Sequence, residues 1–180
     1  MTNTKWALDP THSEVQFKVK HLMVSTVTGQ FKQFNATVET DGDDMSTAKV
    51  HFTAEADSIF TNNEHRDAHL KNADFFDAEN HPQLIFDSSE FEKVDNENYK
   101  MYGTLTMRGV SKEVALNVEY GGMVQDPWGN TRVGFSVSGK INRKAHGVVM
   151  PTEVGGALLG EEVTLNANVA FVKVKELQPA

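Results

Sequence analysis

Apolar and polar residues alternate with a period of two along most of the chain. In residues 14–20, for example, Val15, Phe17 and Val19 share one side of an extended backbone, and polar residues occupy the other side. This period is typical of a β-strand that has one face in the protein interior and one in water. Eight segments show the pattern: 14–20, 34–39, 49–56, 83–92, 99–107, 112–120, 132–141 and 162–172.

Eight strands with one apolar face each predict an all-β antiparallel fold that buries this face. A sandwich of two sheets would bury it, but a closed barrel is favoured because closure leaves no strand edge exposed. Turn-forming residues fall between the segments, at 41–44, 95–98, 108–109 and 126–130. The prediction is an eight-stranded antiparallel β-barrel. Residues 1–180 are expected to form a single domain, because no linker or internal repeat divides them.

Three stretches depart from the alternation. Residues 61–76 predict a helix near one mouth of the barrel, with Thr61 or Asn62 as its N-cap. Residues 142–161 form a long connection that contains glycine, and such connections are often lids or binding loops. The parity of the apolar positions slips within residues 31–34, which predicts a bulge or a sharp bend there.

The composition excludes several classes of site. The chain has no cysteine, so it has no disulfide, thiolate metal site or cysteine nucleophile. Its net charge of -8 argues against nucleic-acid binding. No apolar run approaches the roughly 20 residues of a membrane-spanning helix. The N-terminal sequence MTNTKWALDP lacks the apolar core of a signal peptide, so a cytoplasmic protein is expected as written, or a periplasmic one if a leader was removed.

The inward faces of the strands define the predicted interior. Small residues on these faces, among them Ala54, Ala56, Gly103, Gly139 and Ala167, would permit a cavity between the larger side chains. A barrel of eight strands encloses a space that side chains can fill or that one small ligand can occupy. The residues expected to form an apolar bore are Phe17, Val19, Phe52, Phe86, Leu105, Leu116, Phe135, Val137, Leu165 and Phe171.

Strands that run in alternating directions would bring the basic residues to one rim of the barrel. That rim would collect His21, Arg66, His69, Arg108, Arg143 and Lys144. The opposite rim would collect Asp41, Asp43, Asp44, Asp95, Glu97 and Asp126. An apolar bore beneath a cationic mouth suits a long-chain isoprenoid or fatty amphiphile with an anionic head group. The residues predicted to contact this head group are His21, Arg66, His69 and Arg143.

Other motifs have simpler explanations. His65 and His69 have the spacing of zinc ligands on a helix, but the glutamate of the His-Glu-x-x-His motif is missing, so a solvated helix face is favoured and no metal is expected. Arg66 and Asp67, together with His69, could pin the helix to the barrel, contact a ligand or take part in catalysis. No catalytic residue is predicted, because no nucleophile elbow or phosphate-binding glycine loop is present.

The order of the motifs resembles that of the YceI-like family over residues 6–172. The motifs that carry this resemblance are Trp6-x-x-Asp9-x-x-His12-Ser13-x-Val15-x-Phe17-x-Val19-x-His21-Leu22, Gly29-x-Phe31-x-x-Phe34, Asp57-Ser58-Ile59, Arg66-Asp67-x-His69-Leu70, Asp74-Phe75-Phe76-Asp77, Pro82-x-Leu84-x-Phe86-x-Ser88, Gly103-x-Leu105-Thr106, Gly134-Phe135 and Asn142-Arg143. The resemblance implies a lipocalin-like barrel with a helix near one mouth, a bound polyisoprenoid or related long-chain amphiphile, and often a homodimer. No cofactor is expected besides the bound lipid.

Three functional hypotheses follow. The first is a binding protein that sequesters, stores or transports an isoprenoid lipid, such as a quinone or a prenyl diphosphate, without chemistry. The second is an enzyme of isoprenoid metabolism that uses Arg66, Asp67 and His69. The third is a stress-related structural protein whose core is filled with side chains.

Overall fold

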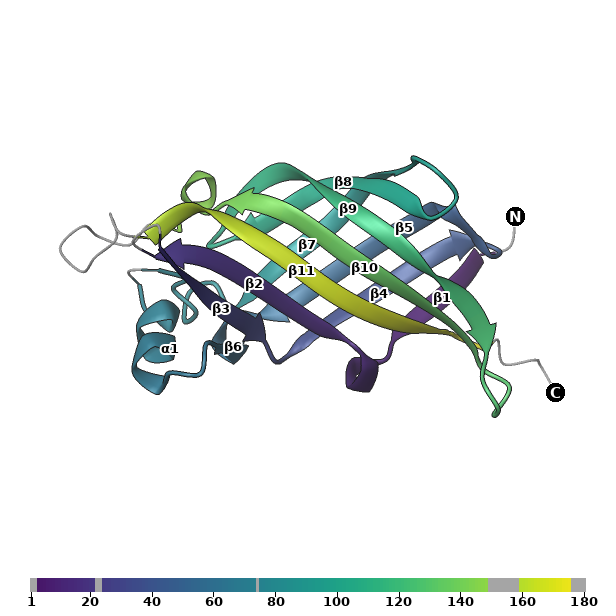
Figure 1. Ribbon diagram of the computed structural model, residues 1–180, viewed down its shortest axis with the longest axis horizontal. Coiled ribbons are helices and arrows are strands. Elements are labelled where there is room, and N and C mark those ends of the chain that lie inside the picture. Colours follow the sequence, from purple (N-terminus) through teal and green to yellow (C-terminus); the bar gives the residue numbers. More distant parts are fainter. Residues whose placement is uncertain (1–2, 22–23, 74, 149–158, 176–180) are drawn as a thin grey trace.

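The strands wind around a single elongated barrel (Figure 1). The computed structural model describes residues 3–21, 24–73, 75–148 and 159–175. The strands are β1 (Asn3–Leu8), β2 (Glu14–His21), β3 (Ser25–Phe31), β4 (Phe34–Asp41), β5 (Asp44–Glu55), β6 (Ile59–Phe60), β7 (Gln83–Lys93), β8 (Asn98–Met107), β9 (Val110–Gln125), β10 (Thr131–Asn142) and β11 (Leu159–Lys173). The helices are α1 (Glu64–Lys71) and three 3-10 turns, η1 (Pro10–His12), η2 (Ala56–Ser58) and η3 (Lys144–His146).

Eight antiparallel strands close the barrel, in the order β1-β4-β5-β7-β8-β9-β10-β11, because β11 also pairs with β1. The predicted eight-stranded barrel is therefore confirmed. The long strand β11 has two partners on the same side: β2 runs along its first part and β1 along its last residues. Helix α1 lies at the end of the barrel opposite the start of β1 and the end of β11 (Figure 1).

The sequence pattern missed β1, β3 and β6. Only residues 34–39 of this region were predicted to form a strand. In the structure, β3 pairs with β2 and β4 pairs with β1, so residues 25–41 contain two strands. Lys32 and Gln33 separate β3 from β4. Phe31 and Ala36 are both buried, one at an odd and one at an even position, so the predicted bend is confirmed. Strand β3 escaped detection because serine, threonine and glycine dominate it.

The predicted helix at 61–76 is shorter in the structure, and its predicted cap was wrong. Asn63 is the N-cap of α1, and its Oδ1 accepts a hydrogen bond from the Arg66 amide at 3.0 Å. Thr61 cannot cap the helix, because its amide and hydroxyl both donate to the Asp67 carboxylate, at 2.9 and 2.5 Å. Of the connection predicted to act as a lid, residues 149–158 lie outside the described residues.

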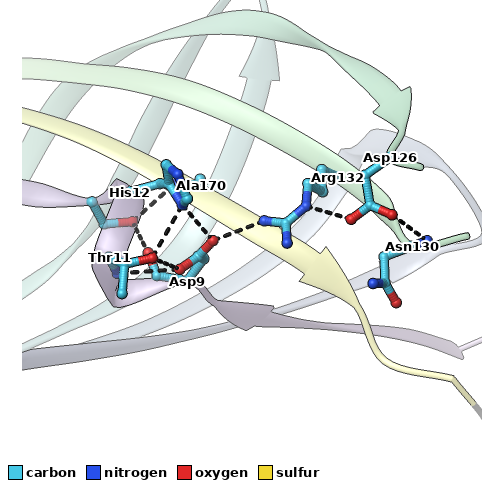
Figure 2. Close-up of polar contacts among 8 residues, drawn as sticks. Asp9, Thr11, His12, Asp126, Asn130, Arg132 and Ala170 are labelled. Carbon is cyan, nitrogen blue, oxygen red and sulfur yellow. Dashed lines mark hydrogen bonds and ion pairs between the residues drawn. The ribbon is translucent and has the colours of Figure 1, made fainter. Parts of the chain in front are cut away.

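A hydrogen-bonded network fixes the break between β1 and β2 (Figure 2). Arg132 on β10 donates to the carboxylate of Asp9 at 2.8 Å and to that of Asp126 at 2.7 Å. Asp9 also accepts from the amide of Thr11, and its own amide donates to the Ala170 carbonyl on β11 at 2.8 Å. The network therefore joins the β1–β2 break, the β9–β10 hairpin and β11 at the point where β11 changes partner.

The free energy of unfolding is expected to fall as the pH drops from about 4 towards 2. Arg132 lowers the pKa of Asp126 to about 2. Hydrogen bonds from Thr11, His12 and Arg132 hold the pKa of Asp9 well below its ordinary value. A carboxylate with a lowered pKa stabilises the fold fully above its unfolded-state pKa, and this stabilisation is lost as the pH falls through the folded-state pKa. Urea unfolding at a series of pH values measures the effect.

The Arg132→Gln variant should be less stable at neutral pH and show a shallower loss of stability with acid. Lys140→Gln is the control, because Lys140 forms an exposed ion pair with Glu162 at 3.4 Å, and such pairs contribute little. An unchanged acid dependence in Arg132→Gln would show that the network is not its source.

Candidate functional site

The barrel encloses a cavity of about 470 Å³ with an almost entirely apolar lining. This volume lies within the range of sites that bind small molecules. The hypothesis of a structural protein with a filled core required an interior without a sizeable cavity. The described residues instead enclose this cavity, so they do not favour that hypothesis. The sequence could not decide between a hollow and a filled barrel, because the difference depends on how the inward side chains pack.

All ten side chains predicted to form the apolar bore line this cavity. They are Phe17 and Val19 on β2, Phe52 on β5, Phe86 on β7, Leu105 on β8, Leu116 on β9, Phe135 and Val137 on β10, and Leu165 and Phe171 on β11. The strict alternation within each strand places them there, since every second residue faces inward. Their contact with a ligand stays a prediction.

Two of the small residues do not create the free space. A Cβ atom on Gly139 would lie 2.5 Å from Leu116 Cδ2, and one on Gly103 would lie 2.6 Å from Phe86 Cζ. The larger side chains therefore cover these two glycines, and neither glycine is among the lining residues. Ala54 does line the cavity.

Several residues that line the cavity near α1 were not predicted from the sequence. Leu70 at the end of the helix and Phe75 and Phe76 just after it contribute to the cavity wall. The rings of Phe75 and Phe76 lie 5.0 Å apart, and Phe76 also meets Phe31 at 6.1 Å. The only signal in the sequence was an apolar cluster outside any strand, and its position depends on how the helix packs against the barrel.

The polar part of the lining gathers at the end of the barrel that carries α1, which we call the mouth. The mouth contains His21, His65, Arg66, His69 and Arg143, so all four predicted head-group residues line the cavity. No aspartate or glutamate is among the described lining residues. Contact between these side chains and a head group stays a prediction.

The outer rim around the mouth is mixed in charge, unlike the lining. Lys144 forms an ion pair with Glu161 at 3.1 Å, and Lys71 lies 3.8 Å from Asp57. Arg108, which was expected at this rim, donates to the Phe75 carbonyl at 2.9 Å and does not line the cavity. The predicted segregation of basic groups therefore holds for the cavity lining and not for the outer surface.

Arg66 and Asp67 meet at Thr61. Arg66 donates from Nε to the Thr61 hydroxyl at 2.7 Å and from Nη2 to the Thr61 carbonyl at 2.5 Å. Asp67 is buried and accepts from the amide and hydroxyl of the same threonine. This geometry favours the interpretation in which the pair pins α1 to the end of β6.

Arg143 is buried, although it was expected to face the opening of the barrel from a loop. Its Nε, Nη1 and Nη2 atoms donate to the carbonyls of Gly160, Val148 and Leu159 at 2.7, 2.9 and 2.9 Å. The side chain thus ties the start of β11 to the segment that follows β10. Burial lowers the pKa of Arg143, but a guanidinium stays protonated in proteins at neutral pH.

Within the described ranges, no three histidine, aspartate or glutamate side chains come close enough to hold a metal ion. Ser13 Oγ donates to the Asp9 carbonyl and accepts from the Ala170 amide. None of the helices in the part of the chain that the structure describes has the length and apolar character to cross a membrane.

The sequence matches a profile of the YceI-like domain over residues 6–171. A UPF0312 protein of Staphylococcus epidermidis is 40% identical over 171 residues, which cover 93% of this chain and 97% of the relative. A UPF0312 protein of Staphylococcus aureus is 39% identical with the same coverage. The chain therefore spans nearly the full length of these relatives.

Solved structures share the fold. The Campylobacter jejuni YCEI protein has a TM-score of 0.76 and 38% identity, covering 87% of this chain and 90% of that one. Burkholderia cenocepacia BcnA has a TM-score of 0.81 and 23% identity, with coverage of 91% and 98%. A polyisoprenoid binding domain from Saccharophagus degradans has a TM-score of 0.68 and 13% identity, with coverage of 93% and 97%. Because their sequence identities are this low, the likenesses to BcnA and to the Saccharophagus degradans domain show only that the fold is shared. By its sequence profile and its relatives, this chain belongs to the YceI-like family.

Proposed function

We propose that the protein binds a polyisoprenoid or a related long-chain amphiphile inside the barrel, and that it sequesters, stores or transports this lipid. The observation that carries the proposal is the apolar cavity of about 470 Å³, which has its polar lining residues at one end. An amphiphile would place its chain along the apolar wall and its head group among His21, Arg66, His69 and Arg143.

The energetics of burial support a long apolar chain. Removing one methylene from water contributes about 0.8 kcal/mol. A chain of twenty carbons would gain more than about 10 kcal/mol before the cost of association is subtracted. The Saccharophagus degradans protein, a polyisoprenoid binding domain, has a barrel of this fold, which supports the proposal by analogy of fold.

Binding without catalysis is part of the proposal. Two members of the suggested catalytic cluster, Arg66 and Asp67, are hydrogen-bonded to Thr61, which suits a structural role better than a chemical one. Loss of substrate turnover in a His69→Ala variant that still binds the lipid would favour the enzyme hypothesis instead. A homodimer, which the resemblance implies, is also part of the proposal and can be tested by the mass of the native protein.

The test is to identify what the protein carries. We expect solvent extraction of the purified protein, followed by mass spectrometry, to release an isoprenoid or another long-chain lipid. We also expect the lipid-free protein to take up geranylgeraniol or geranylgeranyl diphosphate. Absence of lipid from the extract, together with no uptake of either compound, would contradict the proposed function.

A further inference from the structure

The wall of the barrel is incompletely paired between β5 and β7. The ladder that joins these strands ends at the pair His51–Asp87. Residues 44–50 of β5 and 88–93 of β7 continue beyond this pair without strand pairing to each other, and all of them lie within the described ranges. In contrast, β10 pairs with β11 along nearly its whole length. We call the unpaired part, residues 44–50 and 88–93, the seam.

Two irregularities accompany the seam. Strand β7 has a bulge between Ser88 and Glu90 in its pairing with β8, and the register of β4 against β5 shifts between Glu39 and Asp41. A bulge bends its strand and interrupts the ladder. The Val50 amide donates to the Ser88 hydroxyl at 2.8 Å instead of to a backbone carbonyl of β7. This amide is therefore satisfied without strand pairing at the start of the seam.

The seam forms a groove that shares part of its wall with the cavity. The groove has a volume of about 640 Å³. Ala48 and Val50 on β5 and Phe91 on β7 line both the groove and the cavity. The other described residues of the groove are polar or charged, and they include the exposed side chains of Lys49 and Ser89. At the seam, single apolar side chains therefore separate the cavity from the outside.

Phe91 is the largest of the three shared side chains, and it is half-buried. Its ring packs on that of Tyr99 on β8, with 5.0 Å between the ring centres. Across the seam it has the smaller side chains of Ala48 and Val50. Where strands are paired, opening the wall would break ladder hydrogen bonds, but at the seam β5 and β7 have no ladder to break. The seam should therefore open more easily than a paired part of the wall.

We propose that the seam is a side passage into the cavity, with Phe91 as its plug, and that an apolar chain enters and leaves through it. The inference rests on the proposed function and adds a route to it. The seam starts at the end of the barrel opposite the mouth, because β5 begins beside the end of β4 that pairs with the start of β1. A long chain that enters here need not be threaded end-on through the mouth.

The test measures how fast the protein takes up and releases cis-parinaric acid, a fatty acid whose fluorescence rises in apolar surroundings. We expect Phe91→Ala to raise the association and dissociation rate constants by about tenfold each in stopped-flow mixing. Phe91→Trp, with a larger ring, should lower both. The affinity should change much less than either rate, because a plug alters the barrier between the free and bound states more than the states themselves.

Phe135→Ala is the matched control, because it removes the same ring from the cavity wall on a fully paired strand. It should weaken the affinity through faster dissociation and leave the association rate constant unchanged. Its association rate constant therefore shows whether faster uptake is specific to the seam. A rise as large as that in Phe91→Ala would overturn the proposal, because the loss of any wall ring would then loosen the barrel.

A second test leaves the core unchanged. The chain has no cysteine, so a bulky maleimide would label Ser89→Cys at this one exposed position in the groove. We expect the labelled protein to take up the probe several-fold more slowly. Ser136→Cys with the same label is the control, because Ser136 is exposed on β10 and does not line the groove. If Phe91→Ala does not fold, this pair decides.

Each remaining outcome has a distinct meaning. Rates that match the wild type in Phe91→Ala, Phe91→Trp and labelled Ser89→Cys, with the probe still bound, would overturn the passage and leave the proposed function standing. Failure of the wild type to bind either cis-parinaric acid or geranylgeraniol would instead contradict the proposed function itself.

Discussion

Replacement of Trp6 by alanine is expected to lower the free energy of unfolding by about 3–5 kcal/mol. Trp6 is 2% exposed and sits in the core where β1 closes the barrel against β4 and β11. Its Nε1 donates to the Thr40 hydroxyl at 2.9 Å. The variant would leave a void and remove this buried hydrogen bond. Urea unfolding followed by circular dichroism measures the change.

Trp128 provides a matched control, because it is the only other tryptophan of the chain and is 77% exposed. Trp128→Ala should change the free energy of unfolding by less than about 0.5 kcal/mol. A loss below about 1 kcal/mol in Trp6→Ala would contradict the tight packing at the closure of the barrel. Because Trp6 is not among the described residues that line the cavity, a Trp6→Ala protein that still folds should take up geranylgeraniol as the wild type is proposed to do.

The same strand shows why part of the fold could not be predicted. Among the six residues of β1, Trp6 alone is buried, so no alternation of apolar side chains marks it. Its pairing with β4 and β11 depends on residues far away in the sequence. In contrast, β10 and β11 are long, and their inward positions are nearly all apolar. Period-two alternation therefore predicted their existence, their approximate bounds and their inward faces.

The candidate site, like the fold, could be predicted from the sequence only in part. Strand parity alone predicted that Phe52 and Leu165 line the cavity, since each follows from its own strand. The topology of alternating strands predicted that His21 and Arg143 meet at one mouth. The carbonyl partners of Arg143 were not predictable. Gly160 and Leu159 belong to a stretch of sequence without period-two alternation, so no pattern indicated that their carbonyls would meet Arg143. Charge can be read from a sequence, but the partners of a buried charge require the fold.

The largest effect on ligand binding is expected for Phe135→Asp. Phe135 lines the cavity near the middle of β10, with Tyr120 at 5.7 Å and Phe171 at 6.3 Å between ring centres. An aspartate there would place a lone carboxylate among aromatic rings. Burying an apolar chain against this charge is very unfavourable. We expect the affinity for geranylgeraniol to fall by about a hundredfold, and the stability to fall as well.

Ser136→Asp is the control for Phe135→Asp, because it adds the same charge on the outer face of β10 and not on the face that lines the cavity. Ser136 is the next residue on β10, is exposed, and donates to Asn168 Oδ1 on β11 at 2.9 Å. The new carboxylate would stay in water, so binding of geranylgeraniol should match the wild type. Phe135→Leu, which keeps the wall apolar, should retain most of the affinity. If Phe135→Asp folded and bound geranylgeraniol normally, the chain of the ligand would not run along β10. In that case the apolar cavity, from which the whole proposal starts, would not be the binding site.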